Sequence, residues 1–213
     1  MSTSTATRRG ARAVRSRRAS RALRRRLGFL GAAAFAALVV AAAIAPWADK
    51  AVQEVKLPLH HEDVIRQQAS DKGLDPALIA SVIYAESHFI DQTSPAGAKG
   101  LMQLMPETAD YIAQKSGGTA FVQGDLASPQ VNIAYGSWYL RYLMRKYEQR
   151  EVLALAAYNA GEGKVDEWLA AATAGGRRFR AADIPFPETR NYVQTVFDAR
   201  KQYRHTYRRE LGL

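Results

Sequence analysis

Cysteine is absent from the 213 residues, and acidic residues are absent before Asp49. Without cysteine, the chain has no disulfide framework, no thiolate metal site and no thiol nucleophile. Stability must therefore come from a hydrophobic core, which 47% hydrophobic residues in a chain of this length can supply. Negative side chains are thus missing only from the N-terminal end, where residues 1–26 hold ten arginines.

The basic charge belongs to this tail. The formal net charge is +10, but from residue 49 onward 20 basic residues balance 20 acidic ones. A domain that binds nucleic acid is expected to carry basic charge on its folded body. The distribution therefore predicts no nucleic-acid partner.

The tail is followed by 19 uncharged, apolar residues, 27–45. As a helix this segment would span about 29 Å at 1.5 Å per residue, close to the thickness of a bilayer core. Arginines before it and none directly after it follow the positive-inside rule. We therefore expect a cytoplasmic tail (1–26), a single-pass transmembrane anchor (27–45), a linker (46–59) and a domain outside the cytoplasmic membrane. The alternative is a cleaved signal peptide with a site near the alanines at 41–43, which would release a secreted domain.

Patterns typical of metal and phosphate sites are weak in this chain. His60 and His61 precede two acids, but neighbouring residues on a helix point in different directions, so they make a poor ligand set. The glycine-rich stretch at 161–164 lacks the spacing and the preceding strand of a phosphate-binding loop. We therefore expect no metal and no cofactor.

Helical periodicity and caps predict a mainly or wholly α fold. No alternating pattern of convincing strand length is present, and residues 121–125 are expected to form a loop. Helices are expected at 62–72, 75–87, 106–115, 129 to about 147, 150–158, 165–172 and 188 to about 208.

One carboxylate lies on an apolar helix stripe. Ile79, Val82 and Ile83 recur at helical spacing, and Glu86 continues the same face. Burial disfavours the charged form of a carboxyl group, so we expect the pKa of Glu86 to be raised, as suits a general acid. The alternative is a structural glutamate satisfied by caps or by an arginine.

The residues around and after Glu86 form an ordered set of motifs. ESHF at 86–89 is followed by SPAGAKGLMQLMP at 94–106, AYNAG at 157–161 and IPFPETRNYV at 184–193. Together they resemble the signature of family 1 soluble lytic transglycosylases, over roughly residues 60–205. The stretch between Phe89 and Ser94 departs from the family by being one residue shorter than the commonest spacing and by lacking its usual proline.

The resemblance implies a lysozyme-like, goose-type helical domain at residues 60–208 with a cleft centred on Glu86. It also implies cleavage of the β-1,4 bond between N-acetylmuramic acid and N-acetylglucosamine in peptidoglycan, with 1,6-anhydro ends. Glu86 would act alone as acid and base, since Asp91, the only other acid nearby, is better placed for a turn. Alternatives are a goose-type hydrolase of the same bond and a non-catalytic murein-binding domain.

The substrate-binding residues are assigned largely by the same resemblance. Gln103 offers an amide for an N-acetyl group, and Met102 a soft apolar wall. Tyr158 and Asn159 have a helix C-cap as an equally weighted alternative, and the resemblance places them beside the reacting sugar. The full set is Ser87, Ser94, Met102, Gln103, Tyr158, Asn159 and Tyr192.

Overall fold

The computed structural model describes residues 38, 40, 42–43, 56–118 and 120–213. The chain divides into two units, Met1–Gln53 and Glu54–Leu213, which are considered separately. The predicted tail, most of the predicted anchor and most of the predicted linker lie outside the described residues. Among the described residues, no helix is both long and apolar enough to cross a membrane.

The second unit is helical, as predicted. Strands are absent from residues 56–118 and 120–213, where only isolated bridges join Lys99 to Thr93 and to Leu104. The elements are α2 (Glu62–Lys72), α3 (Pro76–Ser87), α4 (Pro106–Ser116), η1 (Gln123–Ala127), α5 (Pro129–Lys146), α6 (Glu151–Ala160), α7 (Glu162–Ala174), η2 (Ala181–Asp183) and α8 (Pro187–Thr206).

Most helix ends are where the capping residues predict them. Asp75 caps α3 by accepting a hydrogen bond from the Ala77 amide, and Gly73 ends α2 in the left-handed conformation at φ 60°. The segment 121–125, predicted as a loop, instead runs into the 3₁₀ helix η1. The cause is local, because the Asp125 carboxylate accepts a hydrogen bond from the Val122 amide and closes the turn.

Helix α7 begins earlier than predicted. Its first apolar residue is Val165, but the helix starts at Glu162, directly after Gly161. Gly161 has φ 87° and separates α6 from α7 with a single residue. A positive φ is inexpensive only for glycine, so this residue lets two helices meet without a longer connection.

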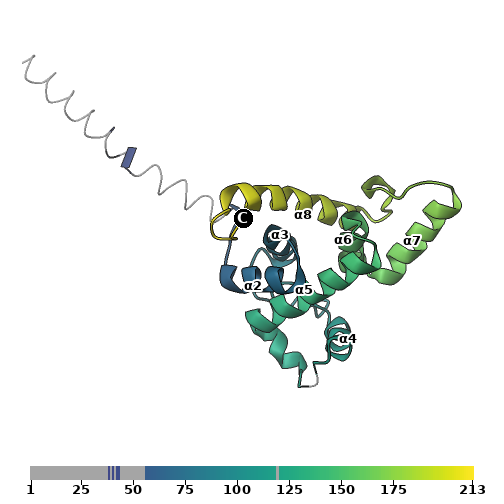
Figure 1. Ribbon diagram of the computed structural model, residues 1–213, viewed down its shortest axis with the longest axis horizontal. Helices are drawn as coiled ribbons and strands as arrows, with labels where there is room; N and C mark the ends of the chain where they lie inside the picture. The colour runs from purple at the N-terminus through teal and green to yellow at the C-terminus, as the bar shows by residue number, and fades with distance from the viewer. Residues whose placement is uncertain (1–37, 39, 41, 44–55, 119) are drawn as a thin grey trace, which may run out of the picture. The chain divides into compact units, whose positions relative to one another are not determined.

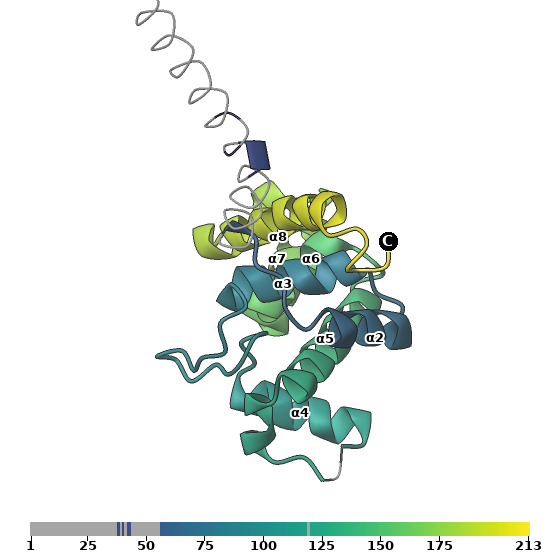
Figure 2. The same ribbon diagram turned by 90° about the vertical axis from the view of Figure 1, so that its left-hand side faces the viewer.

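Helices α3, α5, α6 and α8 position the site (Figures 1 and 2). Helix α3 packs along α8, and α5 contacts α2 on one side and α6 on the other. At the start of α3, Asp75 accepts hydrogen bonds from Arg200 at 2.6 Å and Arg204 at 2.8 Å, both on α8. Arg200 also reaches Glu151 of α6 at 2.8 Å. This half-buried ion cluster ties three helices together at one end.

The segment between α3 and α4 forms an irregular arm that projects from the helices (Figure 2). Asn132 of α5, which is fully buried, holds its base. The Asn132 carboxamide accepts from the Met102 amide at 2.8 Å and donates to the carbonyls of Lys99 at 2.9 Å and Leu126 at 3.2 Å. One side chain thus fixes the arm to both α5 and η1.

Candidate active site

Glu86 lies in the last turn of α3, where the chain changes direction. His88 at φ 52° and Phe89 at φ 62° are both left-handed and lead the backbone into the arm. The Glu86 side chain is largely buried, and burial raises its pKa to about 7, while a hydrogen-bonding contribution from Tyr192 acts to lower it. The expected desolvation is therefore present, and the group can be protonated at neutral pH.

Two tyrosines from different helices flank this carboxyl group. Burial raises the pKa of both Tyr158 (α6) and Tyr192 (α8) well above the usual value, and the negative charge of Glu86 raises both further. Both therefore remain neutral phenols. The Tyr158 hydroxyl donates to the Met102 carbonyl at 3.0 Å. The Tyr192 hydroxyl makes no hydrogen bond of normal geometry within the described residues, although it lies near enough to Glu86 to affect its pKa.

A pocket of about 260 Å³ opens between the base of the arm and the α6–α7 junction. Glu86 is not among its lining residues, and Tyr158 connects the two, since it lines the pocket and interacts electrostatically with Glu86. The lining is Gln103, Leu104, Met105, Thr108, Tyr139, Ala157, Tyr158, Asn159, Ala160 and Gly161.

Gln103 is held in a defined orientation at the edge of this pocket. Its backbone is left-handed at φ 46°. Its side-chain NH₂ donates to the Gly100 carbonyl at 2.7 Å and to the Gln92 carbonyl at 3.0 Å. With both hydrogens used, the amide oxygen remains to accept a hydrogen bond, for which the N–H of an acetamido group is a suitable donor.

A carboxylate on α7 binds a tyrosine that lines the pocket. The Glu162 carboxylate accepts from the hydroxyls of Tyr139 at 3.4 Å and Tyr142 at 3.2 Å and pairs with Lys146 at 2.6 Å. The Tyr139 ring lies 5.6 Å from the Tyr158 ring, centroid to centroid. Glu162 thus fixes one aromatic residue of the pocket through its hydroxyl group. No group of three or more potential metal ligands occurs among the described residues.

The family model for the transglycosylase SLT domain matches residues 63–178. The chain belongs to this family.

Curated relatives of the SLT-domain chain include the soluble lytic murein transglycosylase of Escherichia coli K12, 34% identical over 157 residues, which are 71% of this chain and 24% of the relative. The membrane-bound lytic murein transglycosylase F of Yersinia pestis (strain Pestoides F) is 36% identical over 110 residues, covering 48% of this chain and 20% of the relative. The chain thus spans about a quarter or less of the length of these relatives.

Solved structures give the same family and confirm the lysozyme-like SLT fold. An inactive glutamate-to-glutamine mutant of the lytic transglycosylase Slt from Pseudomonas aeruginosa superposes with a TM-score of 0.66 at 34% identity, covering 73% of this chain and 26% of that one. The 70 kDa soluble lytic transglycosylase of Escherichia coli gives a TM-score of 0.66 at 33% identity, covering 72% and 25%, and has also been solved with bulgecin A.

The SLT domain brings four of the predicted site residues together. Gln103, Tyr158 and Asn159 line the pocket, and Tyr192 lies beside Glu86. Ser94 lies elsewhere, in the arm, where its hydroxyl accepts a hydrogen bond from the Ala98 amide at 3.0 Å. Its position supports a role in shaping the arm.

Two predictions for this SLT domain need correction. Met102 is 0% exposed, because the absent side chain at Gly136 leaves room for it inside the core, so it cannot form a cleft wall. Ser87 is buried, and its hydroxyl donates to the Leu101 carbonyl at 2.7 Å, which joins α3 to the arm. Neither residue lines the pocket.

Two pocket residues were missed by the sequence interpretation. Met105 is 38% exposed and lines the pocket, taking the place expected for Met102. The sequence offered one clue to this residue, because Met105 stands at the N-cap of α4 and belongs to no helical repeat of apolar residues. Tyr139 also lines the pocket. The sequence offered one clue to it, because Tyr139 carries a hydroxyl group and lies in the segment of α5 that is rich in aromatic residues.

Proposed function

We propose that this chain is a peptidoglycan lytic transglycosylase with Glu86 as its sole acid and base. The observation that carries the proposal is a carboxyl group with a pKa of about 7, between two neutral phenols and beside a pocket that no aspartate or glutamate lines. Glycosidases that hydrolyse their substrate normally use two carboxyl groups, about 5–9.5 Å apart. A single carboxyl group suits a reaction in which the substrate itself supplies the nucleophiles that a second carboxylate or a water molecule would otherwise provide.

In the first step, protonated Glu86 donates its proton to the oxygen that links N-acetylmuramic acid to N-acetylglucosamine. The bond between C1 and this oxygen breaks, and the acetamido oxygen of the muramic residue bonds to C1. Glu86, now a carboxylate, takes the proton of the C6 hydroxyl. O6 then bonds to C1 and displaces the acetamido oxygen, which closes the 1,6-anhydro ring and restores protonated Glu86 without consuming water.

The surrounding residues suit this sequence of steps. A pKa of about 7 makes both the acidic and the basic form accessible to one group at neutral pH. The free hydroxyl of Tyr192 can donate to Glu86 when it is a carboxylate and so limit the cost of its charge. Gln103 and Asn159 line the pocket and carry amide groups that can hydrogen-bond acetamido groups, and Met105 adds an apolar surface for the sugar rings.

The remaining parts of the proposal concern organisation. Residues 60–208 form the SLT domain, and residues 27–45 anchor it to the outer face of the cytoplasmic membrane after an arginine-rich tail. One relative is named membrane-bound and another soluble, so similar proteins include both kinds. Fractionation with intact-mass measurement tests the anchor. A soluble product that begins near residue 44 would show cleavage instead.

Product analysis tests the chemistry. The full chain is incubated with purified murein, and the fragments are measured by mass spectrometry. One new anhydro end is expected for each bond cleaved. Reducing ends would show hydrolysis by a goose-type lysozyme mechanism, and unchanged murein with retained binding would show a non-catalytic domain. Glu86→Gln is the matched control, because it keeps the shape of the side chain and removes the transferable proton.

A further inference from the structure

Charge is distributed unevenly along the chain of the SLT domain. Residues 175–213 carry nine basic and four acidic side chains, a net charge of +5, whereas residues 49–174 carry 11 basic and 16 acidic ones, a net charge of −5. The two parts cancel, so the neutral total conceals a basic segment that begins after α7 and includes α8. Such a separation of charge orients a protein toward a charged partner even when its net charge is zero.

Five exposed arginines of this basic segment form no ion pair within the described residues. They are Arg178, Arg180, Arg190, Arg208 and Arg209. The other four basic residues of the segment lie 2.6–3.6 Å from carboxylates. In the same described residues, the carboxylates of Glu188 and Glu210 also lack an ion pair. The unpaired groups of the segment therefore leave three positive charges in excess.

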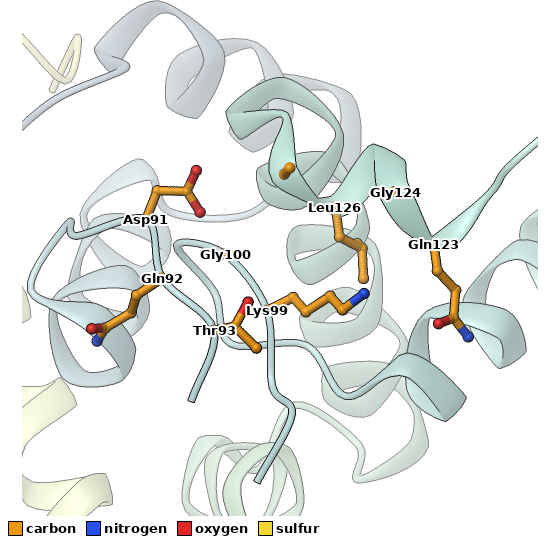
Figure 3. A pocket seen from close by; sticks show the side chains of 9 residues that line it. Asp91, Gln92, Thr93, Lys99, Gly100, Gln123, Gly124 and Leu126 are labelled. Carbon is orange, nitrogen blue, oxygen red and sulfur yellow. The ribbon is translucent and has the colours of Figure 1, made fainter. Parts of the chain in front are cut away.

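Lysines of α5 and of the arm, by contrast, share their surroundings with carboxylates. Lys146 on α5 pairs with Glu162 at 2.6 Å and with Asp166 at 2.9 Å. Lys99 in the arm lines a pocket that Asp91 also lines, as Figure 3 shows. A neighbouring carboxylate offsets the attraction of a lysine for an anionic surface. The unpaired arginines of residues 175–213 are therefore better suited to such a surface.

The five arginines belong to segments on one side of the domain. Residues 177–186 and α8 both lie on the side opposite α4 in Figures 1 and 2. Phe179 is buried between two exposed arginines, and Arg180 is extended at φ −127° and ψ 167°. Since successive side chains of an extended chain point to opposite sides, burial of Phe179 directs Arg178 and Arg180 outward. We refer to α8 and the five arginines as the α8 face.

The chain enters the domain at the C-terminal end of α8. The Tyr207 hydroxyl donates to the carbonyl of Leu57 at 2.8 Å, the Tyr203 hydroxyl donates to the carbonyl of Pro58, and Leu57 is buried. The 11 residues 46–56 lie between the proposed anchor and this fixed point, and they reach at most about 40 Å when extended. A tether of this length raises the effective concentration of a bilayer at the α8 face, so a modest excess of charge is enough for binding.

We propose that the α8 face binds the phosphate groups of an anionic lipid bilayer. That a bilayer is within reach rests on the proposed anchor. Guanidinium groups form paired, charge-assisted hydrogen bonds with phosphate oxygens. Phe186, which is 45% exposed at the N-cap of α8, adds an aromatic group of the kind found at headgroup level. Residues 175–213 do not line the catalytic pocket, so the domain can bind a bilayer and a glycan strand at the same time.

Energy transfer from the domain to the bilayer measures this contact in the full chain. The chain has no cysteine, so Thr195→Cys on α8 and Gln114→Cys on α4 each give one exposed position for a donor dye. The acceptor is a lipid labelled on its headgroup, in vesicles of phosphatidylcholine with or without phosphatidylglycerol. Adding phosphatidylglycerol should raise transfer from residue 195 but not from residue 114. Salt at 1 M should abolish the rise, since the Debye length is then about 3 Å.

Paired substitutions identify the charges responsible. An arginine near an anionic bilayer contributes a factor of about five to binding, so Arg178→Gln with Arg180→Gln should lower the equilibrium constant for contact about 25-fold. Arg208→Gln with Arg209→Gln should act alike. The matched control removes two charges from the arm and α4, by Lys99→Gln with Lys115→Gln, and should change nothing. An equal effect of the control pair would overturn the proposal, as would transfer from residue 195 that does not depend on phosphatidylglycerol.

The anchor is tested separately by flotation of the full chain with phosphatidylcholine vesicles at 1 M salt, where binding through surface charge is screened. A chain that does not float under these conditions has no anchor, which would refute that part of the proposed function. The same labelled chains, added to vesicles that contain phosphatidylglycerol, then still test the α8 face. Transfer that rises equally from residues 195 and 114 would show binding without a preferred face and would also overturn the proposal.

Discussion

Replacing Glu86 by glutamine should change stability in a pH-dependent way that reports the environment of this one group. The folded-state pKa is raised from 4.5 to about 7. Below pH 4.5 the carboxyl group is protonated in both the folded and the unfolded chain, so it causes no difference. As the pH rises from about 4.5 to about 7, only the unfolded chain loses the proton, and the wild type loses stability. Above about pH 7 the loss is complete.

The size of this loss follows from the same two values. At 1.36 kcal/mol per pKa unit, a shift from 4.5 to about 7 is worth about 3 kcal/mol. Glutamine has a similar shape and does not titrate. The free energy of unfolding of Glu86→Gln minus that of the wild type should therefore rise by about 3 kcal/mol between pH 4 and pH 8.

Urea unfolding of both proteins at four pH values between 4 and 8.5 measures this difference. Subtraction removes every other titrating group, because the two chains differ only at residue 86. The Gln variant should meanwhile show no cleavage of murein. A difference in unfolding free energy that does not change with pH would refute the argument, because it would mean that Glu86 is solvated in the folded chain. For the wild type, kcat/KM should fall as the pH rises through about 7, since the first step needs the protonated acid.

Four further substitutions test neighbouring parts of the site. Tyr192→Phe removes the hydroxyl group that lowers the pKa of Glu86, so the alkaline limb of the pH–rate profile should move to higher pH, and an unchanged limb would contradict this. Met102→Ala should destabilise the fold by about 2–5 kcal/mol because the side chain is fully buried, whereas Met105→Ala should leave the unfolding midpoint nearly unchanged and raise KM. Asn132→Ala removes three hydrogen bonds and should lower the free energy of unfolding by about 2–4 kcal/mol. Limited proteolysis should then cut the arm earlier than in the wild type, and an arm that resists the protease as well as the wild type does would contradict this.

The helices and Glu86 could be predicted because their signals are local. Proline follows a capping position at the start of α3, and periodic apolar residues define the face that Glu86 shares. A carboxylate on an apolar stripe implies desolvation whatever the fold, and the raised pKa follows from that. The same local signals located the ends of α2 and α3 to within a residue.

The arm could not be predicted in the same way, because its conformation depends on residues distant in sequence. Residues 101–105 follow no period, so the sequence does not show which methionine is buried. The choice is made by Asn132, which binds the Met102 amide, and by the space beside Gly136. Ser87 was misinterpreted for a related reason, since its partner, the Leu101 carbonyl, lies 14 residues further along the chain.

The pairing of Gly136 with Met102 constrains how this domain can change by mutation. A side chain of any size at residue 136 would overlap the Met102 side chain, and moving Met102 would displace Gln103 beside it. A larger residue at 136 is therefore acceptable only together with a smaller one at 102. Homologous sequences should show these two positions varying together. A chimaera that takes the arm from another SLT domain should include α5 of the same donor.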